Sequence, residues 1–148
     1  MAKNLRTIIF IFLVTILSLI TVPCLASAST FTLGIYQGVQ LSENQVVESK
    51  DAKADLTVSP RYKGYVAYAV LQATKLKEFE TRPDLSNLTT KDVENFKELV
   101  FAPAAGYYYL VKSKDNRYYL CKLESFENQG KAQSYWKLTF SSEELSLK

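Results

Sequence analysis

The segment from Tyr107 to Leu123 constrains the fold of this chain more than any other part of its sequence. Two runs rich in Tyr, Leu and Val, which favour strands, lie on either side of a polar stretch with Asp115 and Asn116 at its corner. The pattern predicts a β-hairpin, because Asn tolerates the left-handed backbone that a tight turn needs. With Asp115-Asn116 as a two-residue loop, the predicted pairs are Val111 with Leu120 and Leu110 with Cys121.

Further short strands are predicted on both sides of this hairpin. The region from Phe31 to about Leu56 contains apolar residues separated by polar turns, and Asn44 suits the corner of a second hairpin. The other predictions are a strand over 54–58 that ends at Ser59-Pro60-Arg61, a largely buried strand within 64–76, a strand over Tyr135–Phe140 with alternating apolar residues, and a polar tail, 141–148, that frays.

One helix is predicted, between Glu80 and Phe101. Thr89 precedes Asp92 by three residues, which resembles a capping box, and Pro103 would stop the helix. The apolar residues recur at helical spacing and would form one stripe that packs on a sheet: Val93, Phe96, Leu99 and Val100.

The first 28 residues predict export. Lys3 and Arg6 precede an apolar run that extends from Ile8 to Val22, and Ala26-Ser27-Ala28 offers a small-x-small cleavage site. This is the pattern of a secretory signal peptide, here residues 1–28. The run is short for a membrane span, which needs about 20 apolar residues. We therefore expect a periplasmic or extracellular protein, with no transmembrane segment after cleavage.

Cys24 offers an alternative at this end of the chain. Bacterial lipoproteins carry a lipidated Cys just after the apolar core of the signal. Here Pro23 directly precedes Cys24 and matches that pattern poorly. Cleavage after Ala28 is therefore the favoured interpretation, and a lipoprotein anchored through Cys24 is the alternative.

Residues 29–148 fit a single domain. Cys121 is the one cysteine of this part, so no disulfide within it is available and the aromatic side chains must supply the core. We expect a mainly β fold: one small antiparallel β domain, sandwich or barrel-like, with a single short inserted helix.

Composition excludes several classes of function. Of the 18 Lys and Arg residues, Lys3 and Arg6 lie in the signal, which leaves 16 against 15 acidic residues, mixed along the chain. No nucleic-acid partner is expected from such a balance. The chain has no His, and its one Met is Met1. A Ser-His-Asp triad, a His-ligated metal and a His- or Met-ligated haem are therefore excluded, and we predict no catalytic residue, no metal site and no cofactor.

Several weak blocks, in order over about residues 36 to 140, resemble the HmuY-type haem-binding proteins, which are small exported bacterial β proteins. Asn44 and Asn116 stand where that group usually has Gly, and both residues tolerate positive φ. The resemblance implies fold and compartment. HmuY-type haem binding uses paired His or Met side chains, which residues 29–148 lack, so haem is not expected. The blocks are Val39-Gln40-Leu41, Val46-Val47-Glu48, Ala54-Asp55-Leu56, Val93 to Leu99, Ala102 to Tyr107 and Tyr109 to Leu123.

Tyrosine is concentrated on the predicted strands of the last third. Successive side chains of a strand point to opposite faces, so about half of these rings share one face. Two interpretations stay open: the rings pack across strands in the core, or those on the outer face form an exposed aromatic platform. The candidate ligand-binding residues are Tyr107, Tyr109, Tyr118, Tyr119, Tyr135 and Trp136.

Together these patterns favour an exported, non-enzymatic binding protein that uses a Tyr-rich sheet face. Its partner would be a glycan, a peptide or a planar small molecule. The alternative is a structural or envelope-associated domain with no small-molecule ligand. An enzyme is not expected, because acid–base chemistry without His would need paired carboxylates or a Lys that its surroundings mark, and none is marked.

The export signal leads to a first prediction. Mass spectrometry of the exported protein should find Ser29 at its N-terminus, because Ala26-Ser27-Ala28 fits the signal peptidase better than the Pro23-Cys24 junction fits lipidation. A lipid-modified Cys24 at the N-terminus would contradict this.

Overall fold

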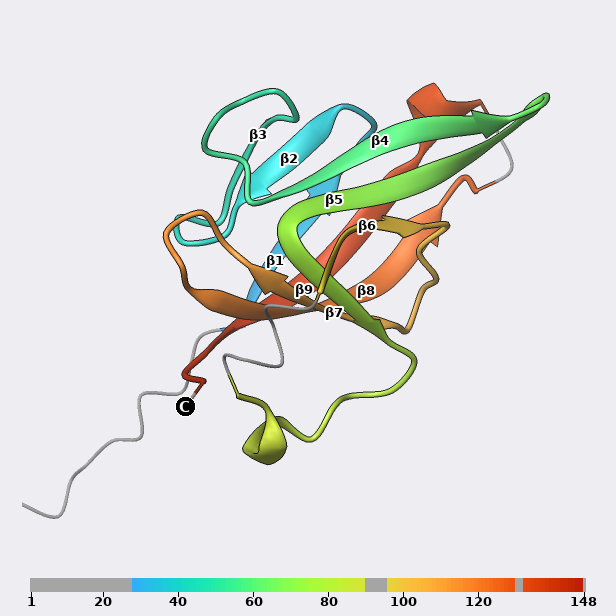
Figure 1. The fold of residues 1–148 in the computed structure, drawn as a ribbon. Coiled ribbons are helices and arrows are strands. Elements are labelled where there is room, and N and C mark those ends of the chain that lie inside the picture. The colour runs from blue at the N-terminus through green and yellow to red at the C-terminus, as the bar shows by residue number, and fades with distance from the viewer. Residues whose placement is uncertain (1–27, 90–95, 130–131, 148) are drawn as a thin grey trace, which may run out of the picture.

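The computed structural model describes residues 28–89, 96–129 and 132–147 (Figure 1). Strands dominate this part of the chain, and helical structure is confined in it to two short 3-10 turns, η1 (Leu85–Asn87) and η2 (Gln133–Tyr135). The strands are β1 (Ser29–Leu33), β2 (Gln37–Gln40), β3 (Gln45–Glu48), β4 (Leu56–Lys63), β5 (Val66–Phe79), β6 (Lys97–Phe101), β7 (Tyr108–Lys112), β8 (Tyr118–Glu127) and β9 (Lys137–Leu145).

The strands form one antiparallel sheet in the order β1-β9-β8-β7-β5-β4-β2-β3, and β6 pairs with β5. The sheet curls into a nearly closed, barrel-like shape, as predicted for a small antiparallel domain (Figure 1). The long strand β5 makes this possible, because it bends and changes partners along its length. Its first part pairs with β4 from Val66 to Ala73, and its last part pairs with β7 from Lys75 to Phe79.

The hairpin of β7 and β8 is confirmed, but its register differs by one residue from the predicted one. Leu110 pairs with Leu120, so the pairing of Val111 with Leu120 and of Leu110 with Cys121 was wrong. The loop has three residues, Lys114 to Asn116, because the backbone N–H of Ser113 donates to the carbonyl of Arg117 at 2.9 Å. Asn116 has φ +63°, the left-handed residue that closes a three-residue loop.

This register divides the side chains of β7 and β8 between two apolar clusters. Tyr109, Val111, Tyr119, Cys121 and Leu123 point into the main core inside the curled sheet. Leu110 and Leu120 point outward and pack with Phe96, and the partly buried Tyr108 and Tyr118 join them. Both faces of this hairpin are therefore covered with apolar side chains.

The predicted helix between Glu80 and Phe101 was wrong for the residues that the structure describes. Residues 97–101 form β6, and Leu99, Val100 and Phe101 pair with Gln72, Leu71 and Val70 of β5. The edge of β5 offered these residues backbone partners and a place for Val100 in the core, which outweighed their helical spacing. η1 is a single 3-10 turn capped by Asp84, and residues 90–95, including Asp92 and Val93, lie outside the described part.

Several of the other predicted boundaries were wrong. The strand predicted over Tyr135–Phe140 begins at Lys137, because Tyr135 ends the 3-10 turn η2, and the strand predicted over 54–58 begins at Leu56. β4 continues through Pro60 to Lys63. Pro60 has no N–H to donate, but β2 pairs with β4 only at Leu56 and Thr57, so the Pro60 nitrogen faces an edge of β4 that β2 does not cover. The tail does not fray at Ser141, since β9 reaches Leu145, where it pairs with β8, and it also pairs with β1 as far as Ser142. The hairpin of β2 and β3 is confirmed, with Asn44 at φ +50°, and the strand predicted within 64–76 is confirmed as β5.

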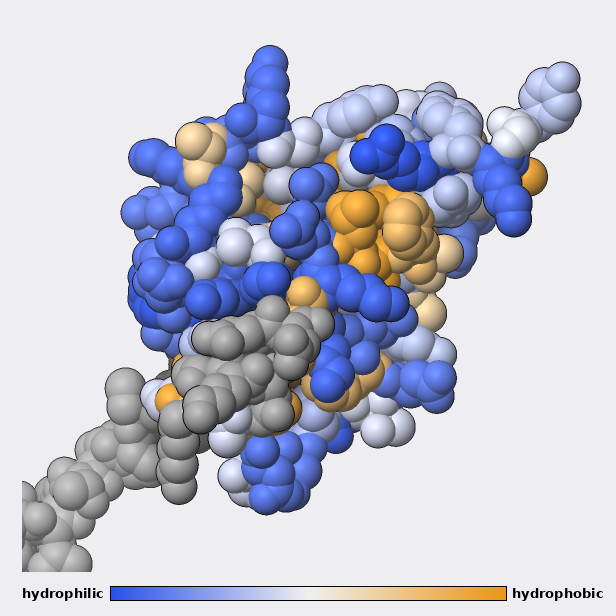
Figure 2. All heavy atoms as spheres, in the orientation of Figure 1, coloured by the Kyte–Doolittle hydropathy of each residue, from blue (hydrophilic) through white to orange (hydrophobic). Residues whose placement is uncertain are grey.

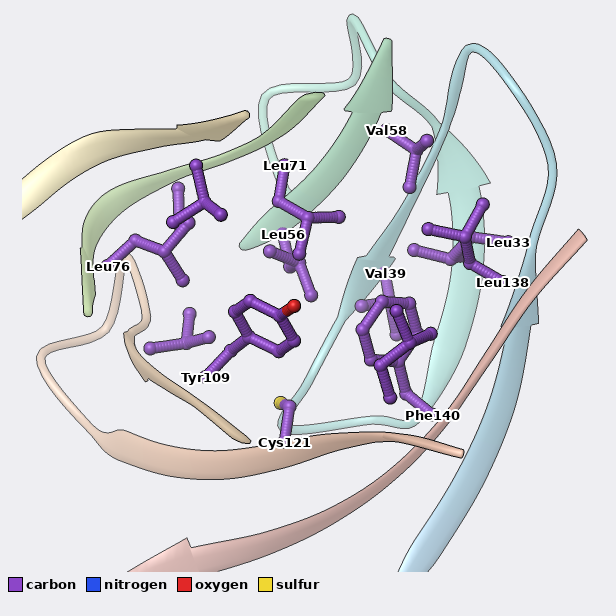
Figure 3. Close-up of a cluster of buried hydrophobic side chains, with 14 of the residues drawn as sticks. Leu33, Val39, Leu56, Val58, Leu71, Leu76, Tyr109, Cys121, Leu138 and Phe140 are labelled. Atoms are coloured by element: carbon purple, nitrogen blue, oxygen red, sulfur yellow. The ribbon is translucent and has the colours of Figure 1, made fainter. Parts of the chain in front are cut away.

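The main core surrounds Tyr109 (Figure 3). Its ring meets that of Phe140 edge-on at 6.3 Å, and Phe140 stacks on Phe31 at 5.4 Å. The buried phenol oxygen is not left unpaired, because it accepts a hydrogen bond from the backbone N–H of Ala104 at 3.0 Å. Aromatic packing and one satisfied hydroxyl thus fill the interior without a disulfide.

A buried carboxylate ties two loops together at one end of the sheet. Asp55 is only 4% exposed, and its two oxygens accept from the backbone N–H groups of Leu41 and Lys114, each at 2.8 Å. Leu41 follows β2 and Lys114 begins the loop between β7 and β8, so a single side chain joins segments far apart in sequence. Hydrogen bonds to a charged acceptor are among the stronger ones in proteins.

We predict that Asp55→Ala lowers the free energy of unfolding by about 3 kcal/mol, because it leaves two backbone donors without their acceptor. Asp55→Asn keeps one acceptor oxygen and should lose about half as much. Urea denaturation measures both, with the exposed Asp51→Ala as the control, which removes one solvent-exposed bond to the N–H of Lys53. An Asp55→Ala variant as stable as Asp51→Ala would contradict the assignment.

Candidate functional site

The six candidate aromatic residues do not share one exposed face. Tyr109, Tyr119 and Trp136 are buried in the main core, and Tyr107 and Tyr118 are partly buried. Tyr135 alone among the six is largely exposed, at 62%. Strand alternation explains the division, because neighbours such as Tyr118 and Tyr119 belong to opposite faces of the sheet.

The exposed tyrosines instead gather at one end of the curled sheet. Tyr36, Tyr62 and Tyr135 are 64%, 61% and 62% exposed, and Tyr65 is fully exposed. They come from the turn between β1 and β2, from the β4–β5 hairpin and from η2, which lie at the upper right of Figure 1. We call Tyr36, Tyr62 and Tyr135 the tyrosine surface. The sequence pattern singled out only the last of these.

Hydrogen bonds hold the tyrosine surface in place. The hydroxyl of Tyr62 donates to Oε1 of Gln133 at 2.6 Å, which joins β4 to η2. The carbonyl of Tyr135 accepts from Nδ2 of Asn128 at 2.9 Å. The next residue, Trp136, is buried below and meets Phe126 edge-on at 5.5 Å. The rings are therefore presented by anchored segments.

Tyr36 adopts a backbone conformation that is unusual for a tyrosine. Its φ is +62°, in the left-handed region that favours Gly and Asn. Two backbone hydrogen bonds hold it there: its N–H donates to Val58 and its carbonyl accepts from Ser49, both at 2.9 Å. Strained residues of this kind cluster at functional sites, because the surrounding structure must enforce them.

Several of the side chains around the tyrosine surface are amides, and the charged Glu48 pairs directly with one of them, Gln37. Gln133 and Asn128 are partly buried, and Gln37 and Gln129 are exposed. Oε1 of Gln37 accepts from the backbone N–H of Gly34 at 2.7 Å, which leaves its NH₂ group to point outward as a donor. Aromatic faces and amide groups are thus combined on one surface.

A groove lies beside β6, apart from the tyrosine surface. This groove has a volume of about 570 Å³ and is lined mainly by apolar side chains, among them Leu76, Leu99 and Phe101. Figure 2 shows the corresponding apolar patch over β6 and the adjoining part of β5. The Nζ atom of Lys77 lies 5.1 Å from the ring centres of both Phe79 and Phe96. The lining contains no thiol or hydroxyl nucleophile.

The most strongly shifted pKa values belong to the core. Burial raises the pKa of Tyr119 to about 12 and also raises the pKa of Tyr109. Burial, with a smaller contribution from Asp55, raises the pKa of the Cys121 thiol, which is fully buried. Groups shifted in this way stay protonated, so these three residues act as packing groups and not as nucleophiles or bases.

Within residues 28–89, 96–129 and 132–147, no cluster of three or more Cys, Asp or Glu side chains is placed to hold a metal ion. The same residues include no helix that is long and apolar enough to cross a membrane. The predicted signal peptide, residues 1–28, and Cys24 fall outside the described part except for Ala28.

No protein-family model, no curated protein and no solved structure matches this chain. The resemblance to HmuY-type proteins therefore stays a prediction from the sequence.

We predict that the Cys121 thiol is unreactive in the folded protein. The experiment uses the full chain with Cys24→Ser, so that Cys121 is the single thiol. An aromatic disulfide reagent should label it only after unfolding in guanidinium chloride, because the side chain is buried and its raised pKa keeps it protonated. Rapid labelling of the folded protein would place Cys121 at the surface and contradict the packing described above.

Proposed function

We propose that this chain is an exported, non-enzymatic binding protein that holds a glycan against the tyrosine surface. The observation that carries the proposal is the exposure of Tyr36, Tyr62 and Tyr135 at one end of a sheet whose interior is filled by packed side chains. Large aromatic rings are otherwise used here for the core, as Tyr109 and Tyr119 show. Rings gathered at the surface are a common mark of a binding site.

The anchoring of the tyrosine surface supports binding. The bond from the hydroxyl of Tyr62 to Gln133 holds one ring in place before a ligand arrives, and two backbone hydrogen bonds hold the turn that presents the ring of Tyr36. Rings that are already ordered lose little conformational entropy on binding, and each presents a large contact area with a polar hydroxyl. The surface therefore suits a ligand that lies flat against several rings.

A glycan fits the chemistry of this surface better than a peptide or a planar molecule. A sugar has one apolar face for an aromatic ring and many hydroxyls that both donate and accept. The amides of Gln37, Gln129 and Gln133 can do the same. A planar ligand would need a narrow apolar slot, and a peptide strand would need an open sheet edge. Tyr36 and Tyr135 lie in a turn and in a 3-10 helix, and Tyr62 lies in β4, whose open edge there includes Pro60, a residue without an N–H to pair with a strand.

The proposal includes no catalytic step and no cofactor. The chain has no His, and its thiol at Cys121 lies in the core. The alternative, a structural or envelope-associated domain without a small-molecule ligand, is favoured by the burial of Tyr109, Tyr119 and Trp136, since these rings serve packing alone.

We predict that the exported protein binds soluble oligosaccharides, measured by calorimetry across a panel of neutral and acidic sugars. Tyr62→Ala combined with Tyr135→Ala should weaken binding by roughly tenfold or more per ring, because the aromatic contact is lost. The matched phenylalanine variants keep the ring and should retain most of the affinity. Val46→Ala, on the exposed strand β3, is the control and should bind like the wild type.

Equal binding by the alanine variants and the wild type would contradict the proposed surface. A wild type that binds no oligosaccharide, while it is folded and monodisperse, would favour the structural alternative.

A further inference from the structure

The β4–β5 hairpin projects beyond the rest of the sheet (Figure 1). Lys63 pairs with Val66, so the loop consists of Gly64 and Tyr65, and Gly64 has the positive φ of +61° that such a tight loop requires. Tyr65 has a relative exposure of 107% and Val66 one of 67%, and a Cβ at Gly64 would meet no atom within 4 Å. We call Arg61–Val66 the hairpin tip. Its apolar side chains contribute nothing to the core.

The hairpin tip is basic. Arg61 and Lys63 are exposed, and among the residues that the structure describes neither forms an ion pair with a carboxylate. The sequence contains no acidic residue between Asp55 and Glu78, a stretch that covers β4 and nearly all of β5. The positive charge at the tip is therefore not neutralised by its own hairpin.

Strand alternation separates this charge from the tyrosine surface. Arg61 and Lys63 are two residues apart and project from one face of β4, and the directly paired Val66 shares that face. Tyr62 projects from the opposite face, where its hydroxyl reaches Gln133. The hairpin thus has a basic, partly apolar face and, behind it, a face that belongs to the proposed glycan site.

We propose that the hairpin tip docks the protein onto a lipid bilayer with anionic headgroups. Tyr is favoured at the level of the headgroups, where its ring is apolar and its hydroxyl remains solvated. Val66 adds a small apolar contact below that level, and Arg61 and Lys63 complement the negative surface. With two cations and two apolar side chains the contact is reversible. This inference goes beyond the proposed function and does not depend on it.

The test is partitioning of the exported protein onto vesicles. Wild type should sediment with vesicles of phosphatidylcholine mixed with phosphatidylglycerol and not with phosphatidylcholine alone, and salt should weaken the binding. Arg61→Gln combined with Lys63→Gln should reduce partitioning about 30-fold. Tyr65→Ser combined with Val66→Ser should reduce it about tenfold. The charge-matched control, Lys53→Gln with Lys112→Gln, changes cations at the opposite end of β4 and in β7 and should bind like the wild type.

A local measurement separates the tip from any other membrane contact. Tyr65→Trp adds a second tryptophan to the chain, whose own Trp136 is buried. On anionic vesicles the added fluorescence should shift to the blue and be quenched by brominated lipid. A protein that sediments while this tryptophan stays unquenched would overturn the proposal, and so would equal partitioning of the charge variant and its control. Tip variants that lose vesicle binding but keep oligosaccharide binding would support it as a separate site.

Discussion

The structure depends on the register of one hairpin, β7 with β8. Its three-residue loop turns Tyr109, Tyr119 and Cys121 toward the inside of the curled sheet. A shift of one residue between the two strands would replace Tyr119 and Cys121 in the core by Tyr118 and Leu120, because strand side chains alternate between faces. The turn chemistry of Ser113 and Asn116 therefore decides how the tyrosines of the last third are used. They chiefly fill the two apolar clusters, so the proposed binding surface is formed mostly by other tyrosines.

The two ends of the sheet have different roles. At one end, Asp55 joins the loop after β2 to the loop after β7, and Ser113 and Arg117 bind Asp115 beside it. At the other end, hydrogen bonds hold the segments that carry the exposed rings of the tyrosine surface, and the exposed Arg61 and Lys63 project from the hairpin tip. Backbone donors meet a buried acceptor at the first end, and the proposed binding surfaces lie at the other. Loops on a rigid scaffold commonly divide the work in this way.

The hairpins could be predicted from the sequence because Asn44 and Asn116 mark their turns directly. The register could not, since Asp-Asn suits both two- and three-residue loops and only the bond between Ser113 and Arg117 decides. The helical spacing of Leu99 and Val100 led to the wrong prediction of a helix for a related reason. Spacing describes one segment by itself, and the free edge of β5 that drew these residues into a strand is a tertiary feature. The sequence could not show which of the candidate tyrosines are exposed, because exposure depends on the face of the sheet that each tyrosine occupies.

One signal for the hairpin tip was present in the sequence, in the acid-free stretch between Asp55 and Glu78 with Gly64 at its centre. Charge alone would not have separated the two proposed surfaces. They are separated by strand alternation, since Tyr62 lies between Arg61 and Lys63 in the chain but on the opposite face of β4. A bilayer on one face then leaves the other open to solvent. A single two-stranded projection can therefore hold the protein at a lipid surface while its tyrosines contact a sugar.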